Sequence, residues 1–102
     1  MATAWVYILE CADHSYYTGM TADIDARLWQ HENGFHDGYT AARRPVKLVW
    51  SDDFDDFGDA IDVERQIKGW TRAKKEALIA GNFELLHELA KSKETKGRER
   101  KA

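Results

Sequence analysis

Cysteine and long apolar stretches are both scarce in this sequence. Cys11 is the single cysteine among 102 residues, so no disulfide can form within the chain. We therefore expect a reducing, cytoplasmic setting. No apolar run approaches the roughly 20 residues that a membrane-spanning helix needs, and residues 1–5 contain no basic region followed by an apolar run. The sequence accordingly predicts neither a membrane segment nor a signal peptide.

The sequence also lacks the positive net charge that is typical of nucleic-acid-binding proteins. It holds 15 basic and 18 acidic side chains, for a net charge of -3. The charges are unevenly distributed, because residues 1–62 hold 4 basic and 12 acidic side chains whereas residues 63–102 hold 11 basic and 6 acidic ones. Since attraction to phosphate depends on the local field, binding to nucleic acid is not excluded, but we expect it to be weak and salt-sensitive.

What is present indicates one small folded domain, since 43% of the residues are hydrophobic and 12% are aromatic. Short apolar runs rich in β-branched and aromatic residues predict three strands, over 5–9, 16–20 and 46–50. Capping residues and apolar stripes predict helices from Thr21 or Asp23 to about 33, from 58 to 70, from Thr71 to about 80 and from Asn82 to about 91. Residues 34–45 and 52–57 are predicted loops.

These elements predict an α/β (α+β) fold, in which a small three-stranded antiparallel or mixed sheet is flanked by helices. The first two strands should form a hairpin through a turn at residues 12–15. The domain is expected to span residues 1–91, with a charged, disordered tail over residues 92–102.

Several polar side chains stand out against this framework. Tyr7 and Tyr17 are predicted near the middle of the hairpin strands, and Gly19 shares a face with Tyr17. Arg27 and His31 are spaced i, i+4 and project from one side of the first helix. Taken alone, strand tyrosines commonly bury their rings, and the Arg/His pair is compatible with a solvated helix face. A functional interpretation has the arginine hold a phosphate and the histidine carry a proton.

Glu64 lies on what should be a buried face of the helix predicted over 58–70. Ala60, Ile61 and Ile67 form the apolar stripe of that helix, and Glu64 falls within the stripe. Buried carboxylates are rare unless they are paired, hydrogen-bonded or bound to a metal. Two interpretations therefore remain open, namely a structural salt bridge to an arginine and a metal site.

Together these residues resemble the GIY-YIG nuclease family. Residues 5–7 (Trp-Val-Tyr) take the place of the family's Gly-Ile-Tyr, and residues 17–19 (Tyr-Thr-Gly) take the place of its Tyr-Ile-Gly. Residues 27–31 match its Arg/His helix, and Glu64 matches its metal-binding glutamate. Each motif is weak by itself, but their order and spacing make the resemblance, which covers roughly residues 4–80, fairly specific.

The stretches 39–49 and 64–70 are similar to those of the small stand-alone bacterial members of the YhbQ type. The sequence departs from the family pattern at Trp5 and Thr18, and Met20 stands where some repair-type members carry a lysine. No second domain that would select a target is evident, so we expect target choice to be poor or to be supplied by a protein partner.

The resemblance implies a divalent-metal-dependent endonuclease that hydrolyses phosphodiester bonds in DNA or RNA, with DNA favoured and with DNA repair or recombination as the setting. Glu64 would bind one Mg²⁺ or Mn²⁺ ion. Tyr17 would help to take a proton from the attacking water, and His31 would accept that proton in turn. Arg27 would stabilise charge on the phosphate, and Tyr7 would orient the water or the phosphate.

A further group of residues is expected to contact nucleic acid, with an ordinary charged surface as the alternative for the basic ones. This group consists of Gly19, Arg43, Arg44, Lys68 and Arg72. Other histidines and tryptophans are expected to have no such role, with the histidines on the surface and the tryptophans in the core or at an interface: His36, His87, Trp29, Trp50 and Trp70.

Three functions remain open from the sequence. The first is the nuclease. The second is a nucleic-acid-binding module that keeps the fold without a useful rate of cleavage. The third is an interaction domain that recruits another protein through the acidic segment 52–62. The intact set of tyrosines, arginine, histidine and glutamate favours the first, whereas the negative net charge favours the others.

Overall fold

The computed structural model describes residues 3–91, so the predicted tail over residues 92–102 lies outside the described residues. The chain groups into two compact units, Met1–Lys68 and Gly69–Ala102. The first unit contains the three strands and helices α1, α2 and α3, and the second contains helix α4 and a further helical segment. The domain boundary expected at residue 91 stays a prediction.

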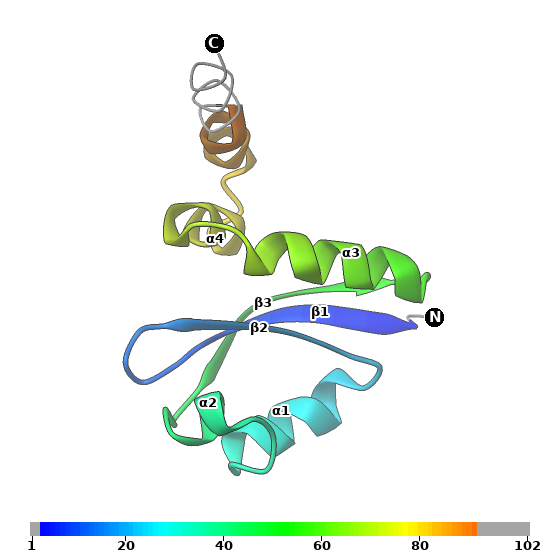
Figure 1. The fold of residues 1–102 in the computed structure, drawn as a ribbon, viewed down its shortest axis with the longest axis vertical. Coiled ribbons are helices and arrows are strands. Elements are labelled where there is room, and N and C mark those ends of the chain that lie inside the picture. The colour runs from blue at the N-terminus through cyan, green and yellow to red at the C-terminus, as the bar shows by residue number, and fades with distance from the viewer. Residues whose placement is uncertain (1–2, 92–102) are drawn as a thin grey trace. The chain divides into compact units, whose positions relative to one another are not determined.

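The three strands of the first unit form one sheet in the order β2-β1-β3 (Figure 1). They span Ala4–Glu10 (β1), Tyr16–Thr21 (β2) and Lys47–Phe54 (β3). Both pairs are antiparallel, and β1 and β2 form the predicted hairpin. The expected small three-stranded sheet is therefore confirmed, and it contains no parallel pair.

Helices cover both faces of this sheet. Helices α1 (Ile24–Glu32) and α2 (Gly38–Ala41) lie on one face, and α3 (Phe57–Lys68) lies on the other (Figure 1). Because the central strand β1 is enclosed from both sides, its alternating side chains are buried in both directions. Val6, Tyr7, Ile8 and Leu9 are all fully buried. This burial explains why the strand is a continuous apolar run rather than an alternating pattern.

Helix α1 begins and ends at the residues that the sequence indicated. Asp23 is its N-cap, and Oδ1 of Asp23 accepts a hydrogen bond from the backbone N–H of Ala26 at 3.1 Å. Asn33 is the C-cap, and Gly34 follows with a positive φ of 76° that glycine adopts without strain. The two caps thereby fix the length of α1, and His31 in its last turn is the buried residue of the helix.

Two segments differ from the prediction. The strand predicted over 46–50 continues to Phe54, because Ser51, Asp52 and Asp53 pair with Tyr7, Val6 and Trp5 of β1. Aspartate is unfavourable in strands, but β3 is an edge strand, and the carboxylates of Asp52 and Asp53 remain exposed to water. Within the predicted loop 34–45, residues 38–41 form the single turn α2.

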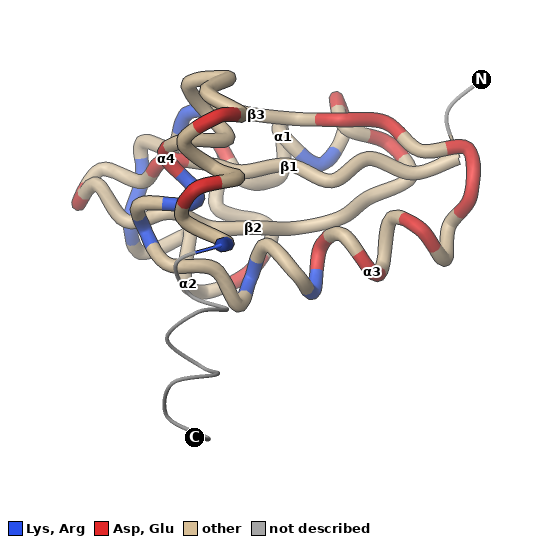
Figure 2. The backbone as a smooth tube through the Cα atoms, turned by 90° about the horizontal axis from the view of Figure 1, so that it is seen from above, with Lys and Arg blue, Asp and Glu red and all other residues tan. Residues whose placement is uncertain are grey.

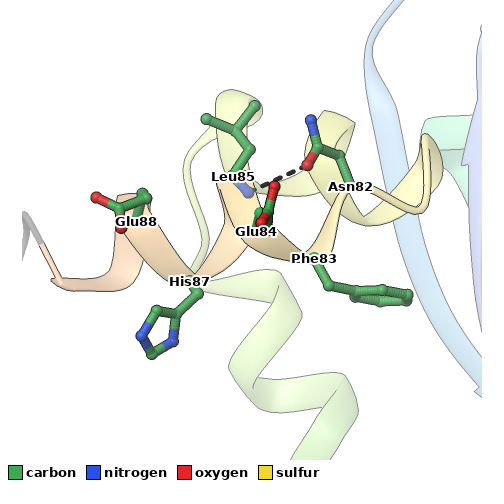
Figure 3. Close-up of a pocket in the computed structure, with 6 residues that line it drawn as sticks. All are labelled: Asn82, Phe83, Glu84, Leu85, His87 and Glu88. Carbon is green, nitrogen blue, oxygen red and sulfur yellow. Dashed lines mark hydrogen bonds between the residues drawn. The ribbon is translucent and has the colours of Figure 1, made fainter.

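The second unit contains the two predicted C-terminal helices. Thr71 caps α4 (Arg72–Ile79), and Asn82 caps the helical segment 83–91 through a 3.1 Å hydrogen bond from the backbone N–H of Leu85 to Oδ1. Figure 3 shows the open hollow on the second helix of this unit. It is lined by Asn82, Phe83, Glu84, Leu85, His87 and Glu88. Within residues 3–91, no helix has the length and apolar character needed to cross a bilayer.

Candidate active site

Tyr7 and His31 meet in the interior between the sheet and α1. The Tyr7 hydroxyl oxygen lies 2.8 Å from Nε2 of His31, and Nδ1 of His31 lies 2.8 Å from Oγ1 of Thr40 on α2. All three side chains are fully buried. The alternative of a solvated helix face is therefore wrong for His31, which instead joins β1, α1 and α2.

The hydrogen-bond partners determine which nitrogen of His31 carries the proton. Oγ1 of Thr40 lies 2.9 Å from the carbonyl oxygen of His36, which can only accept, so the Thr40 hydroxyl donates to it. The same Oγ1 then accepts from Nδ1–H of His31, which leaves Nε2 to accept from the Tyr7 hydroxyl. The result is a chain of hydrogen bonds that all run in one direction, from Tyr7 through a neutral His31 to α2.

The surroundings of His31 keep it neutral. Burial above all, together with the charges of His36 and Arg27, lowers the pKa of His31 to about 4, and the Asp37 carboxylate only partly offsets these effects. The imidazole is therefore uncharged at neutral pH and accepts the Tyr7 proton as a hydrogen bond without removing it.

This burial makes stability depend on pH, because the unfolded chain binds a proton at His31 more readily than the folded chain does. The ordinary histidine pKa is 6.5 and that of folded His31 is about 4. The stabilisation is complete above pH 6.5 and is lost as the pH falls to about 4. We expect His31 alone to lower the free energy of unfolding by about 3 kcal/mol across this window.

Urea unfolding at several pH values measures this loss. His31→Gln should flatten the decline, although His36 will contribute in the same direction because burial also lowers its pKa. His87→Gln, at an exposed position in the second unit, should reproduce the wild-type profile. An equally steep decline in His31→Gln would assign the effect to other groups.

Tyr17 and Asp37 form the more accessible side of the cluster. The half-buried Tyr17 donates its hydroxyl hydrogen bond to Oδ2 of Asp37 at 3.1 Å, and its ring lies against that of His31 with centroids 5.2 Å apart. Burial, the neighbouring Tyr7 and the Asp37 carboxylate together raise the pKa of Tyr17. Asp37 stays ionised, because the backbone N–H of Tyr39 and the Tyr17 hydroxyl both lower its pKa.

Arg27 supplies a fixed positive charge beside both phenols. Its Nη1 donates to the carbonyl oxygen of Met20 at 3.2 Å and lies 3.2 Å from Nε2 of His36. Burial raises the pKa of Tyr7 and of Tyr17, and the guanidinium of Arg27 partly offsets this effect by lowering both pKa values. His36, expected at the surface, is half-buried and packs against His31 with ring centroids 4.8 Å apart.

Glu64 approaches from α3, on the face of the sheet opposite to α1. Its Oε2 forms an ion pair of 2.9 Å with Nζ of Lys68, and its side chain is 18% exposed. The partner is thus a lysine one helical turn away and not an arginine. The Glu64 carboxylate also contributes to raising the pKa of Tyr7, so its charge acts on that phenol. Of the predicted catalytic residues, Tyr7, Tyr17 and His31 are in direct contact, Arg27 reaches His31 through His36, and Glu64 acts on Tyr7 through its charge.

Gly19 has a specific structural reason to lack a side chain. It lies opposite Tyr7 in the hairpin, and a Cβ atom at this position would lie 2.5 Å from Cζ of the Tyr7 ring. The phenol thus lies across the backbone of β2 in space that only glycine leaves open. Gly19 was expected to contact nucleic acid, but the space beside its Cα atom is filled by the Tyr7 ring.

We expect Gly19→Ala to lower the free energy of unfolding by about 1–3 kcal/mol, since the Tyr7 ring must move and break its bond to His31. Urea unfolding at neutral pH tests this value. Gly38→Ala is the matched control, because a Cβ atom at Gly38 has no neighbour within 4 Å. Equal stability of the two variants would contradict the steric argument.

The basic residues expected to contact nucleic acid have other partners. Arg43 pairs with Asp13 at 3.1 Å and covers the Tyr39 ring, with Cζ 3.8 Å from the centroid. Arg44 is exposed and donates from Nε to a carbonyl oxygen of α2. Lys68 pairs with Glu64, and Arg72, in the second unit, pairs with Glu76 at 3.2 Å. Exposed pairs of this kind are weak, so they leave these cations able to exchange partners.

One group in the cluster was not predicted as part of the site. His36, Asp37, Tyr39 and Thr40 come from the segment that was expected to be a loop, in which only Arg43 and Arg44 were assigned a contact. Asp37 has a positive φ of 63° and caps the four-residue helix α2. The stretch similar to YhbQ-type members includes Tyr39 and Thr40 but assigned them no role, and so short a helix has no apolar periodicity that would have singled out these residues.

Comparison with known proteins agrees with this geometry. Residues 3–77 match the GIY-YIG catalytic domain. The chain belongs to the GIY-YIG family. It is 43% identical to a UPF0213 protein of Natronomonas pharaonis over 79 residues, which cover 78% of this chain and 93% of the relative. Nucleases with a GIY-YIG domain act on nucleic acid and generally use a divalent metal ion.

Two solution NMR structures have a similar fold. The UPF0213 protein of Bacillus halodurans is 42% identical, with a TM-score of 0.52 over 76% of this chain and 82% of the other. A protein of E. faecalis is 32% identical, with a TM-score of 0.57 over 81% of this chain and 92% of the other. The predicted fold class and the similarity to small stand-alone members are therefore confirmed.

The donor set fits the kind of metal that GIY-YIG nucleases use. Within residues 3–91, no group of three or more histidine, cysteine, aspartate or glutamate side chains is arranged to hold an ion. Magnesium-type ions do not need such a cage, because they keep several waters and commonly take one or two carboxylates together with a substrate phosphate. Glu64, a partly exposed oxygen donor, meets this requirement.

Proposed function

We propose that this protein is a divalent-metal-dependent endonuclease that hydrolyses phosphodiester bonds of nucleic acid at the cluster of Tyr7, Tyr17, Arg27 and His31. One observation carries the proposal. The two phenols and the imidazole, which come from three different elements, are in contact, and the charges of Arg27 and Glu64 both act on Tyr7. A purely structural core has no need for a fixed cation beside two phenols.

In this proposal Tyr17 meets the attacking water, because its phenol is half-buried whereas that of Tyr7 is fully buried. Asp37, the acceptor of the Tyr17 hydrogen bond, orients the phenol. His31 was expected to take the proton from Tyr17, but its hydrogen bond goes to Tyr7. We therefore propose a positioning role for the hydrogen-bonded series Tyr7, His31 and Thr40. It fixes the His31 ring, against which the Tyr17 ring packs.

Arg27 favours the reaction in two ways. Its positive charge lowers the pKa of Tyr17 against the effect of burial, which favours the phenolate that accepts a proton. The same charge stabilises the extra negative charge on the phosphoryl oxygens in the transition state. Glu64 would hold the Mg²⁺ or Mn²⁺ ion, which when bound polarises the phosphate and stabilises the leaving oxygen.

A gel assay with labelled single-stranded, duplex and branched DNA and with RNA tests the proposal. Cleavage is expected with Mg²⁺ or Mn²⁺ and should stop when a chelator is added. Binding without cleavage under any of these conditions would favour the nucleic-acid-binding module. We propose DNA in preference to RNA, a cytoplasmic setting, a role in repair or recombination, and a protein partner that selects the target.

A protein-interaction domain is the second candidate, and an acidic surface favours it. Six exposed aspartates follow one another along the end of β3, the connecting loop and the first turns of α3 (Figure 2). They are Asp52, Asp53, Asp55, Asp56, Asp59 and Asp62. This surface repels phosphate and suits a basic protein partner. Absence of both cleavage and nucleic-acid binding at low salt would favour this candidate.

A further inference from the structure

Two large aromatic side chains lie exposed and stacked at the C-terminal end of α1. Trp29, on α1, is 57% exposed and Phe35, in the following loop, is 73% exposed. Their ring centroids are 5.7 Å apart and their planes differ by 17°. Trp29, which was expected in the core or at an interface, is therefore not in the core. We call this pair the aromatic platform.

The loop that carries Phe35 also contacts the candidate active site. The backbone N–H of Phe35 donates to the carbonyl oxygen of Gln30 at 2.8 Å, which holds the loop against the end of α1. The next residue, His36, packs against His31, and its Nε2 lies 3.2 Å from Nη1 of Arg27. This loop therefore links the platform, which lies on the outer side of α1, to Arg27 and His31, which project from another side of the helix.

A cation also lies beside the aromatic platform. Arg44 places its guanidinium next to Gly34, with Cζ 3.0 Å from the point where a Cβ atom of Gly34 would stand. Gly34 immediately precedes Phe35, so Arg44 and Arg27 flank the loop that carries the platform. Flat aromatic surface beside a positive charge is complementary to unpaired bases on a phosphate backbone.

We propose that the aromatic platform stacks unpaired bases, so that the substrate is a single strand or a single-stranded segment of a branched nucleic acid. This inference rests on the proposed nuclease function. Residues 1–62 have three times as many acidic as basic side chains, so electrostatic attraction alone cannot provide strong binding. Stacking adds affinity without net charge, and it discriminates against duplexes, in which neighbouring base pairs cover the faces of each base.

Fluorescence anisotropy in the presence of a chelator tests this inference without cleavage. The probes are a fluorescein-labelled oligothymidylate and its duplex with oligoadenylate. Phe35→Ala and Trp29→Ala should each weaken single-strand binding roughly 5- to 150-fold, the range for loss of one stacked base, with duplex binding nearly unchanged. Phe35→Trp should retain the affinity for the single strand.

Phe83→Ala is the matched control, because Phe83 is 66% exposed and lies in the second unit. It should bind both probes as the wild type does. The inference is overturned if single-strand binding does not change in Phe35→Ala, or if both probes are weakened equally. It is also overturned if Phe35→Ala alters the oligomeric state measured by sedimentation but does not alter binding to either probe, because a second copy of the protein would then cover the rings.

The gel assay separates this inference from the proposed function. Single-strand binding that depends on Phe35 without any metal-dependent cleavage supports the platform and overturns the nuclease. Cleavage by the wild type with no preference for unpaired strands, and with no response to Phe35→Ala, supports the nuclease and overturns the platform.

Discussion

Replacement of Glu64 by glutamine should lower the rate of metal-dependent cleavage by about 100-fold or more. Glutamine has nearly the shape of glutamate but no charge, so it cannot hold a divalent ion as a carboxylate does. The fold should remain intact, because the lost pair with Lys68 is an i, i+4 pair with a half-exposed lysine and contributes about 0.5 kcal/mol or less. Cleavage rates at increasing Mn²⁺ concentration measure the effect.

Glu76→Gln is the matched control for this experiment. Glu76 forms the same kind of i, i+4 pair, with Arg72, but it lies in the second unit. Its replacement should leave both the rate and the Mn²⁺ dependence unchanged. Cleavage by Glu64→Gln at the wild-type rate would show that this carboxylate does not hold the metal, and the proposed site would have to be abandoned.

Tyr17→Phe should lower cleavage by about 10²- to 10⁴-fold, the usual contribution of a general base. The hydroxyl that it removes is bonded only to the exposed Asp37 among the described residues, so stability should change little. Tyr16→Phe is the matched control, because Tyr16 is the neighbouring residue of β2 and points to the opposite face of the sheet. Gel assays at one metal concentration compare the two variants.

If Tyr17 is the general base, the pH dependence of cleavage should follow the pKa of its hydroxyl group. The Asp37 carboxylate contributes to raising that pKa, so Asp37→Asn should lower it and move the rising limb of the pH–rate profile to lower pH. Asparagine keeps a side-chain oxygen that can cap α2. If Asp37→Asn leaves the rising limb of the pH–rate profile unchanged, or if Tyr17→Phe is fully active, the general base is a group other than Tyr17.

Much of the framework was predictable because it depends on neighbours in the sequence. The caps Asp23, Thr71 and Asn82 act on backbone N–H groups three residues away, and the apolar run of β1 indicates a strand covered on both faces. The extension of β3 was not predictable, because aspartates enter a strand there only through pairing with β1.

The prediction for Glu64 was correct in one respect and incomplete in another. Its position within the apolar stripe of α3 indicated partial burial, and its side chain is 18% exposed. The alternative of a salt bridge to an arginine is wrong, because Glu64 pairs with Lys68, and the choice between Lys68 and a distant arginine depends on how α3 lies on the sheet. Similarly, the large apolar side chain of Trp29 is of a kind common in cores, and only the packing of α1 shows that it is exposed.

The amino-acid sequence by itself determined the order of strands and helices, the family, and the set of side chains available for chemistry. The tertiary structure alone decided that Tyr7 is the buried phenol and Tyr17 the accessible one, that His31 is neutral with its proton on Nδ1, and that α2 completes the cluster. The physical reason is that protonation and accessibility depend on desolvation and on hydrogen-bond partners. These partners lie up to 24 residues away along the chain, beyond the reach of any local pattern.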